Sequence, residues 1–346
     1  MVSGMPTRLA LAVLSCALSA LAQPEPTIRV DVRLVRVLAT VKDASGAPVG
    51  SLNKQDFELR DNGALQQLAV FERQTEQPLS VAVLIDNSGS TAKDLKYETE
   101  SVSRFLRALL REGNPADAAS LYSFNWEIVR QNGFTRNAAA IEHSLKALRG
   151  EAGTAMYDAV LLASRDIEDR VGRKVLVIVT DGGDTVSRTD FQRATEAAQL
   201  ADAVIYPILV VPIINDAGRN TGGENALATM ASRTGGRVFQ PTLGAQMDQA
   251  FDQILRDLRT QYLLGFYPKE VPLTKDRFHT LQLSVHNPQL HVVARSGYYG
   301  EAQADASSGS GAGSAGVSSA GETVRPPRKQ PPTPPSAPAK KGKVSN

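Results

Sequence analysis

Cysteine is nearly absent from this chain, since Cys16 is the only one among 346 residues. It lies in residues 1–22, where a single arginine precedes an uncharged apolar stretch that ends in Ala20-Leu21-Ala22. This layout is typical of a cleaved secretory signal peptide. Cleavage after Ala22 would leave a mature protein without disulfides or thiol chemistry. We therefore expect a secreted, periplasmic or cell-envelope protein of a bacterium, large enough to be stable without covalent cross-links.

Long hydrophobic runs are missing as well. The apolar stretch of residues 9–21 is too short to span a bilayer, so no transmembrane helix is expected after signal removal. In an alternative reading, Cys16 becomes the lipid-modified first residue of a lipoprotein. Val13-Leu14-Ser15-Cys16 matches a lipobox poorly, which disfavours that alternative.

The chain also lacks a large excess of charge of one sign. Its formal net charge of +2 gives no reason to expect a nucleic-acid partner. Residues 300–346 are rich in Gly and Ser and then in Pro and Lys, a composition that predicts disorder. This basic tail could associate weakly with an acidic envelope surface, but we favour the simpler interpretation of a solvated tail.

Histidine is scarce, with four in the whole chain. His279, His286 and His291 lie in one C-terminal segment, where a zinc site would need them to converge. His279 and His286 are seven residues apart, so on one strand they would point to opposite faces. No zinc site is expected there.

Residues 27–77 alternate apolar and polar side chains as β-strands do. The alternation changes parity after Leu34, which predicts a β-bulge or a strand buried on both faces. Asn62-Gly63 between two apolar segments predicts a hairpin turn. Residues 260–299 contain strand-like patterns again, at residues 261–267, 279–285 and 290–296. We expect the two segments to pair into one small β subdomain, with residues 79–258 inserted between them.

Residues 79–258 alternate apolar strands with helical patterns. This order predicts an α/β fold in which a doubly wound, mainly parallel sheet carries helices on both faces, as in Rossmann-like domains. Strands are predicted at residues 80–85, 118–124, 127–131, 174–180, 203–210 and 237–240. Helices are predicted at residues 93–111, 138–148, 155–170, 189–200, 223–234 and 245–258.

Oxygen-bearing side chains follow two of these strands. The first predicted strand ends in Asp86-Asn87-Ser88-Gly89-Ser90, and Asp181 follows the strand at residues 174–180. Functional groups of doubly wound sheets collect at such carboxyl ends, where the strand order reverses. Thr154, after a glycine-containing loop and just before a helix, offers a hydroxyl to the same edge. Carboxylates and hydroxyls are hard ligands that suit Mg²⁺, Ca²⁺ or Mn²⁺.

These residues resemble the metal-ion-dependent adhesion site of von Willebrand factor type A (VWFA) domains. The resemblance covers residues 79–258, and Asp86, Ser88, Ser90, Thr154 and Asp181 fill all five motif positions. The flanks resemble a bacterial VWFA-related branch first noted in acidobacteria. The matching segments are Asp56-Phe57-Glu58-Leu59, Asn62-Gly63, Gln261-Tyr262-Leu263-Leu264-Gly265-Phe266 and Arg295-Ser296-Gly297-Tyr298-Tyr299.

The resemblance implies a role for each motif residue. Ser88, Ser90 and Thr154 would be ligands of the ion, directly or through water. Asp86 and Asp181 would ligate it or hold its ordered waters. Mg²⁺ is the favoured ion, with Ca²⁺ or Mn²⁺ as alternatives. An open coordination position could then accept an Asp or Glu carboxylate from a partner protein.

Four nearby residues carry weaker signals. Asp158 and Asp184 could hold the ligands in place or bind the ion themselves, and Asp184 could equally cap the helix that follows it. For Glu151 we favour a solvated loop charge. For Trp126 we favour packing in a hairpin over a role in binding.

The expected function is metal-dependent protein binding rather than catalysis. A metal-dependent hydrolase or phosphoryl-transfer enzyme is a less favoured alternative. The sequence has no nucleophile-elbow glycine at Asp86, no Walker lysine after a glycine loop and no second aspartate two residues after Asp86. A structural or assembly subunit with a stabilising ion stays open as a further alternative.

Overall fold

The structure is a computed structural model that describes residues 34–73, 77–91, 94–210, 221–241, 244–271 and 277–300. The predicted signal peptide, the predicted strand residues 27–33 and residues 301–346 of the predicted disordered tail lie outside these ranges. Within the described ranges, none of the helices combines the length and the apolar character needed to span a membrane.

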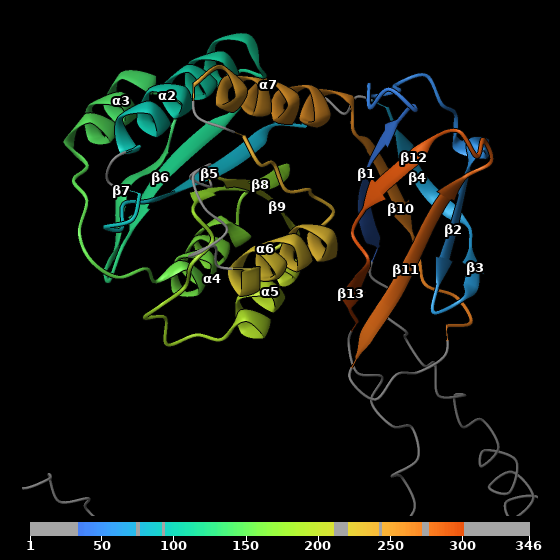
Figure 1. The fold of residues 1–346 in the computed structure, drawn as a ribbon. Helices are drawn as coiled ribbons and strands as arrows, with labels where there is room; N and C mark the ends of the chain where they lie inside the picture. The colour runs from blue at the N-terminus through green and yellow to red at the C-terminus, as the bar shows by residue number, and fades with distance from the viewer. Residues whose placement is uncertain are drawn as a thin grey trace, which may run out of the picture. The chain divides into compact units, whose positions relative to one another are not determined.

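A five-stranded sheet forms the centre of the α/β part (Figure 1). Its order is β7-β6-β5-β8-β9, and β5, β6, β8 and β9 run parallel while β7 pairs antiparallel with β6. The strands are β5 (Leu79–Asp86), β6 (Ala118–Phe124), β7 (Ile128–Thr135), β8 (Arg173–Thr180) and β9 (Ala203–Leu209). Every residue of β5, β6 and β9 is buried, as expected for strands covered on both faces.

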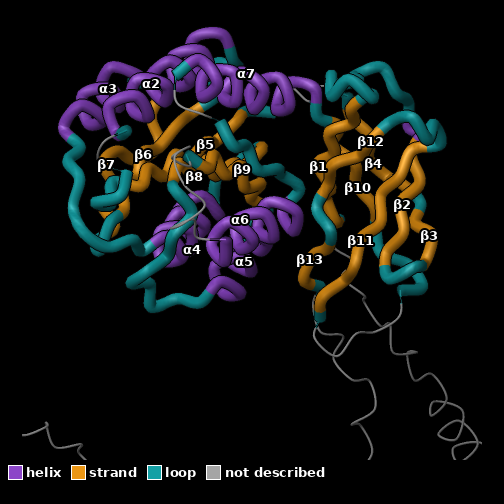
Figure 2. Tube along the Cα trace, viewed as in Figure 1, coloured by secondary structure: helices purple, strands orange, loops and turns teal. Residues whose placement is uncertain are grey.

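Helices cover both faces of this sheet (Figure 2). On one face lie α2 (Leu95–Glu112), α3 (Ala138–Ala147) and α7 (Ala245–Thr260), which share a core with Val81, Val83 and Ile85 of β5. On the other face lie α4 (Met156–Glu168), α5 (Phe191–Leu200) and α6 (Thr221–Thr234), which share a core with Ala82 and Leu84. Successive side chains of β5 therefore pack into the cores on opposite faces of the sheet. The predicted fold class is confirmed.

The chain segments on either side of the α/β part pair with each other. One antiparallel sheet has the order β12-β1-β10-β4, and a second has the order β13-β11-β2-β3. The N-terminal strands are β1 (Val35–Lys42), β2 (Phe57–Asp61), β3 (Ala64–Gln66) and β4 (Leu68–Glu72). The C-terminal strands are β10 (Tyr262–Phe266), β11 (Phe278–Val285), β12 (His291–Ala294) and β13 (Gly297–Tyr299). Both sheets contribute side chains to one apolar core.

Two local predictions in this β part have clear physical outcomes. Asn62 and Gly63 both have positive φ values, 46° and 86°, as a two-residue hairpin turn between β2 and β3 requires. The second half of β1 is buried on both faces, because Thr40 and Lys42 are buried alongside Ala39 and Val41. The parity change at Leu34 therefore precedes a doubly buried strand.

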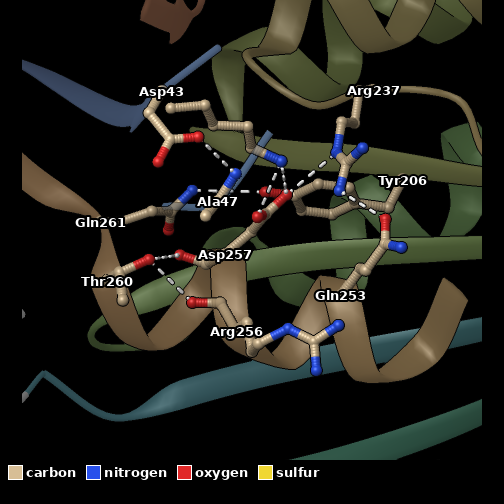
Figure 3. A network of polar contacts seen from close by, with 10 residues as sticks. Asp43, Ala47, Tyr206, Arg237, Gln253, Arg256, Asp257, Thr260 and Gln261 are labelled. Carbon is tan, nitrogen blue, oxygen red and sulfur yellow. Dashed lines mark hydrogen bonds and ion pairs between the residues drawn. The ribbon is translucent and has the colours of Figure 1, made fainter. Parts of the chain in front are cut away.

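A buried ion cluster joins β1 to the α/β part. The Nζ of Lys42 lies 2.9 Å from each carboxylate oxygen of Asp257 on α7. Arg237 approaches the same carboxylate with its Nε at 3.0 Å and also donates to Gln253 (Figure 3). Burial lowers the pKa of the Lys42 ammonium, and the hydrogen bond with Asp257 opposes that effect. The hydrogen bond between Lys42 and Asp257 joins residues that are 215 positions apart in the chain.

Some predicted strand boundaries were wrong. The strand predicted at residues 237–240 is a single bridge between Phe239 and Ile208. The strand predicted at residues 127–131 begins at Ile128 and is longer than predicted, because β7 continues to Thr135 along β6. Gly297–Tyr299 forms β13, a strand that was not predicted, by pairing with the start of β11. Such short pairings depend on a distant partner strand rather than on local sequence.

Candidate metal centre

The site is built at the carboxyl ends of β5 and β8, which are neighbouring parallel strands as predicted. Ile85 pairs with Val179, so Asp86 and Thr180 stand side by side at the edge of the sheet. The chain leaves β5 toward α2 on one face and leaves β8 toward α5 on the other. A crevice at such a reversal is where doubly wound folds place ligand-binding groups.

Asp86 is fully buried, and both of its carboxylate oxygens are held. One oxygen accepts the backbone N–H of Ser88 at 2.8 Å, and the other accepts the hydroxyl of Thr180 at 2.6 Å. Burial raises the pKa of Asp86 to about 6, although these hydrogen bonds act to lower it. The negative charge of Asp181 adds to the increase. A carboxylate placed this way is well suited to a cation that would restore its ionised form.

The two serine hydroxyls of the motif lie together. The Oγ atoms of Ser88 and Ser90 are 3.0 Å apart, and Ser88 is buried while Ser90 is exposed. Thr91 holds this turn by donating its hydroxyl to the carbonyl oxygens of Asp86 and Ser88, at 3.0 and 3.1 Å. The turn therefore presents a hydroxyl pair with one side open to solvent.

The loop that carries Thr154 is tied to the other two. Glu151 donates its backbone N–H to the carbonyl of Asn87 at 2.9 Å, which joins this loop to the β5–α2 turn. Thr185 donates its N–H to the carbonyl of Thr154 at 2.9 Å and accepts the N–H of Thr154 at its hydroxyl. Thr154 is 5% exposed. These backbone bonds bring all three motif loops to one place.

Asp181, directly after β8, is half-buried and accepts the N–H of Gly183 at 3.3 Å. Asp86 ends β5 and Asp181 follows its paired neighbour β8, and the charge of Asp181 contributes to the raised pKa of Asp86. The five predicted residues thus come from three joined loops and offer two carboxylates and three hydroxyls. This donor set fits a hard divalent cation.

Asp158 and Asp184 turn out to organise the third loop. Asp184 accepts the N–H of Tyr157 in the first turn of α4, at 3.0 Å, so it caps a helix that precedes it in the chain. The helix that follows Asp184 is capped by Asp190 instead. Asp158 accepts the N–H groups of Arg188 and Thr189. Both acids therefore fix loops around Thr154 and Asp181.

The interpretation of Trp126 as hairpin packing was wrong. Its side chain is 61% exposed and donates its indole N–H to the carboxylate of Glu151 at 3.1 Å. Gly153, at φ +84°, lies so close to Trp126 that a Cβ there would be 3.0 Å from the Cβ of the tryptophan. An exposed aromatic ring therefore lies against the loop that carries Thr154.

One acidic residue near the site was missed. Glu98 on α2 is fully buried, and its pKa is raised to about 9 by burial and by the charges of Asp86, Asp94 and Asp181. The sequence does hold a signal for it. Glu98 is three residues after Leu95 and four before Val102, so it occupies the apolar face of its helix.

Of the three C-terminal histidines, His279 is held by hydrogen bonds within the β part. The Nδ1 of His279 lies 3.0 Å from the buried carboxylate of Asp61, which also accepts the hydroxyl of Tyr298 at 2.7 Å. Across the described residues, no group of three or more His, Cys, Asp or Glu side chains is arranged to hold a metal. His279 therefore serves the β part as a hydrogen-bonding residue.

Comparison with known proteins agrees with this architecture. The family model of the von Willebrand factor type A domain matches residues 80–253, and the chain belongs to that family. Domains of this family often mediate protein–protein interaction. No curated protein sequence matches the chain.

Several solved structures are similar over about half of the chain. The vWF domain of the type V pili tip protein Mfa5 from Porphyromonas gingivalis is 17% identical, with a TM-score of 0.44 over 51% of this chain and 94% of that one. An aerotolerance-related membrane protein from Bacteroides fragilis is 18% identical, with a TM-score of 0.40 over 52% and 98%. The PilB minor pilin from Streptococcus sanguinis is 13% identical, with a TM-score of 0.40 over 54% and 61%.

Proposed function

We propose that this domain binds a divalent cation, Mg²⁺ in the first place, and uses it to capture an Asp or Glu carboxylate of a partner protein. Ser88, Ser90, Thr154, Asp86 and Asp181 would hold the ion, directly or through water. The observation that carries the proposal is the hydrogen-bonded joining of their three loops around buried Asp86. Ca²⁺ and Mn²⁺ have the same preference for oxygen ligands and are the alternatives.

The balance of charges favours binding over catalysis. Two carboxylates roughly neutralise a divalent ion, while the neutral hydroxyls leave it able to attract a further anionic oxygen. Ser90 is exposed and Asp181 half-buried, so a partner can approach from that side. Exposed Trp126 lies on the neighbouring loop, where it offers apolar surface to the same partner.

We also propose that the protein works outside the cytoplasm, in the periplasm, at the cell envelope or in the medium. The support is the signal-like composition of residues 1–22. A partner would then be another envelope or surface protein.

Isothermal titration calorimetry with Mg²⁺ tests the ion site. Wild type should bind Mg²⁺, and Asp86→Ala should not, while circular dichroism shows the same helix content for both. Glu100→Ala is the matched control, because Glu100 is an exposed acid on α2. Unaltered Mg²⁺ affinity in Asp86→Ala would refute the site.

A pull-down from envelope extract, with Mg²⁺ or with EDTA, tests the capture of a partner. Loss of the partner in EDTA with the fold intact supports adhesion. Loss of the fold itself in EDTA supports the alternative of a structural subunit with a stabilising ion. Turnover of a captured protein that needs Mg²⁺ and Asp86 would favour the enzyme alternative.

A further inference from the structure

Glu98 is the most unusual acidic residue in the described part of the chain. It lies in the first turn of α2 with no exposed surface, and neither of its carboxylate oxygens has a hydrogen-bond partner. Burying an ionised carboxylate without a partner is very costly, and buried polar groups are nearly always paired. An acid kept in this position therefore needs a specific explanation.

The surroundings of Glu98 point to the candidate metal centre. The charged groups that act on it are Asp86, Asp94 and Asp181, and all three have the same sign. Its helix follows the motif turn directly, and Thr91 in that turn bonds to the carbonyls of Asp86 and Ser88. Within the described ranges Glu98 has no Lys or Arg ion-pair partner.

A cation bound at the motif would supply the positive charge that Glu98 lacks among its neighbours. It would attract all three nearby carboxylates and replace their mutual repulsion with attraction. Both oxygens of Glu98 are buried and have no hydrogen-bond partner, so a cation nearby would be the first group to offset this carboxylate.

We propose that Glu98 supports the ion site from the first turn of α2, as a buried acid without a partner whose charge the bound cation would offset. The proposal rests on the proposed function, because it assumes that the motif residues bind a cation. A third carboxylate would tighten the hold on the ion before any partner arrives. It would also reduce the ion's attraction for a partner's carboxylate. Glu98 would therefore strengthen the binding of the ion and weaken the capture of the partner.

The test compares full-length wild type with Glu98→Gln, which removes the charge at nearly the same size. Glu100→Gln, on the exposed side of the same helix, is the matched control. Calorimetry should show Mg²⁺ affinity weakened about 10- to 100-fold in Glu98→Gln, the range seen when groups that support a metal ligand are removed. The control should keep the wild-type affinity.

Thermal unfolding gives a second readout that a merely structural role would not produce. In EDTA near neutral pH, Glu98→Gln should unfold at the same or a higher temperature than wild type, because the neutral amide does not have to take up a proton on folding as the raised pKa of Glu98 requires. With saturating Mg²⁺ the order should reverse. A variant that loses stability equally in both conditions would show that Glu98 serves the fold alone, and the proposal would be wrong.

The outcomes separate this inference from the function it rests on. Wild type that fails to bind Mg²⁺, Ca²⁺ or Mn²⁺ overturns the proposed function and this inference together. Wild type that binds while Glu98→Gln binds equally well overturns the role of Glu98 alone. If Glu98→Gln does not fold, Glu98→Met replaces the acid with an apolar chain suited to a buried position, and the same comparisons apply.

Discussion

Asp86 and Thr180 are joined across β5 and β8 by a hydrogen bond of 2.6 Å from the threonine hydroxyl to the carboxylate. The same hydroxyl accepts the N–H of Gly182 at 3.1 Å, so Thr180 orients both the acid of one strand and the turn after the other. It precedes Asp181 directly. Thr180 is thus a positioning residue for both acids of the candidate metal centre.

Removing this hydroxyl should loosen the site. Thr180→Val keeps the shape but leaves one oxygen of buried Asp86 and the N–H of Gly182 without a partner. We expect a stability loss of about 1–3 kcal/mol in urea unfolding. Mg²⁺ affinity in calorimetry should weaken about tenfold or more. Thr195→Val is the control, because the Thr195 hydroxyl bonds within α5, and its ion affinity should match wild type.

The pH dependence of metal-free stability follows from the two buried acids. Burial is the main cause that raises the pKa of Asp86 from 3.8 to about 6 and that of Glu98 from 4.5 to about 9. The folded state therefore binds these protons more tightly than the unfolded state. Below the pKa values that the two acids have in the unfolded state, their contribution to stability is fully present. It is lost as the pH rises through the pKa values that they have in the folded state.

In EDTA, the melting temperature should accordingly fall as the pH is raised from about 4 to about 9. Glu98→Gln should flatten the upper part of this curve, above the pKa of Asp86. Mg²⁺ affinity should rise with pH over the same window, because the carboxylates must lose their protons to bind the ion. A wild-type profile in EDTA that is superimposable on that of Glu98→Gln would contradict the assignment.

Trp126 is the only tryptophan in the chain, so its fluorescence reports on one place. Its indole is bonded to Glu151, and Glu151 pairs with Ser88 of the motif turn. Mg²⁺ should therefore change the emission of wild type and leave Asp86→Ala unchanged. Ion binding by calorimetry without any change in emission would show that the two loops are not coupled.

Trp126 also predicts where a partner makes contact. Trp126→Ala should weaken capture of the partner in Mg²⁺ and leave ion affinity at the wild-type value, because the indole is no ligand. Tyr267→Ala offers a control for loss of an exposed aromatic ring in the β part, 46% exposed, and should retain capture. Equal capture by wild type and Trp126→Ala would remove the ring from the binding surface.

The arrangement of the α/β part was predictable from the sequence because its signals are local and repeated. Apolar strands such as residues 80–85 and amphipathic helices such as residues 245–258 alternate in an order that leaves few topologies. The place of Asp86 and Asp181 followed from the same rule, since neighbouring parallel strands end at one edge. What these residues bind is still a prediction.

Other features could not be predicted because they depend on side-chain direction or distant contacts. Trp126 follows a strand, and whether its ring turns inward depends on the loop at Gly153. The only signal for Glu98 in the sequence is its place on the apolar face of its helix, and only the fold shows which charged groups lie near it. The pairing of Lys42 with Asp257 joins segments on opposite sides of the inserted domain.

That buried pair gives a last prediction about stability. Asp257→Ala would leave the ammonium of Lys42 buried without its partner and would remove a contact of Arg237. Removing one partner of a buried ion pair typically costs about 3–5 kcal/mol. Urea unfolding should show a loss of this size.

Asp248→Ala is the matched control for this prediction, because Asp248 lies on the same helix and pairs with Arg104 at the surface. An exposed ion pair of this kind contributes at most about 1 kcal/mol, so the control should stay near wild type. Replacing both members of the buried pair, as Lys42→Met with Asp257→Leu, should recover much of the loss, because neither charge is then left uncompensated. Similar losses for Asp257→Ala and Asp248→Ala would mean that the cluster joining β1 to α7 does not stabilise the fold.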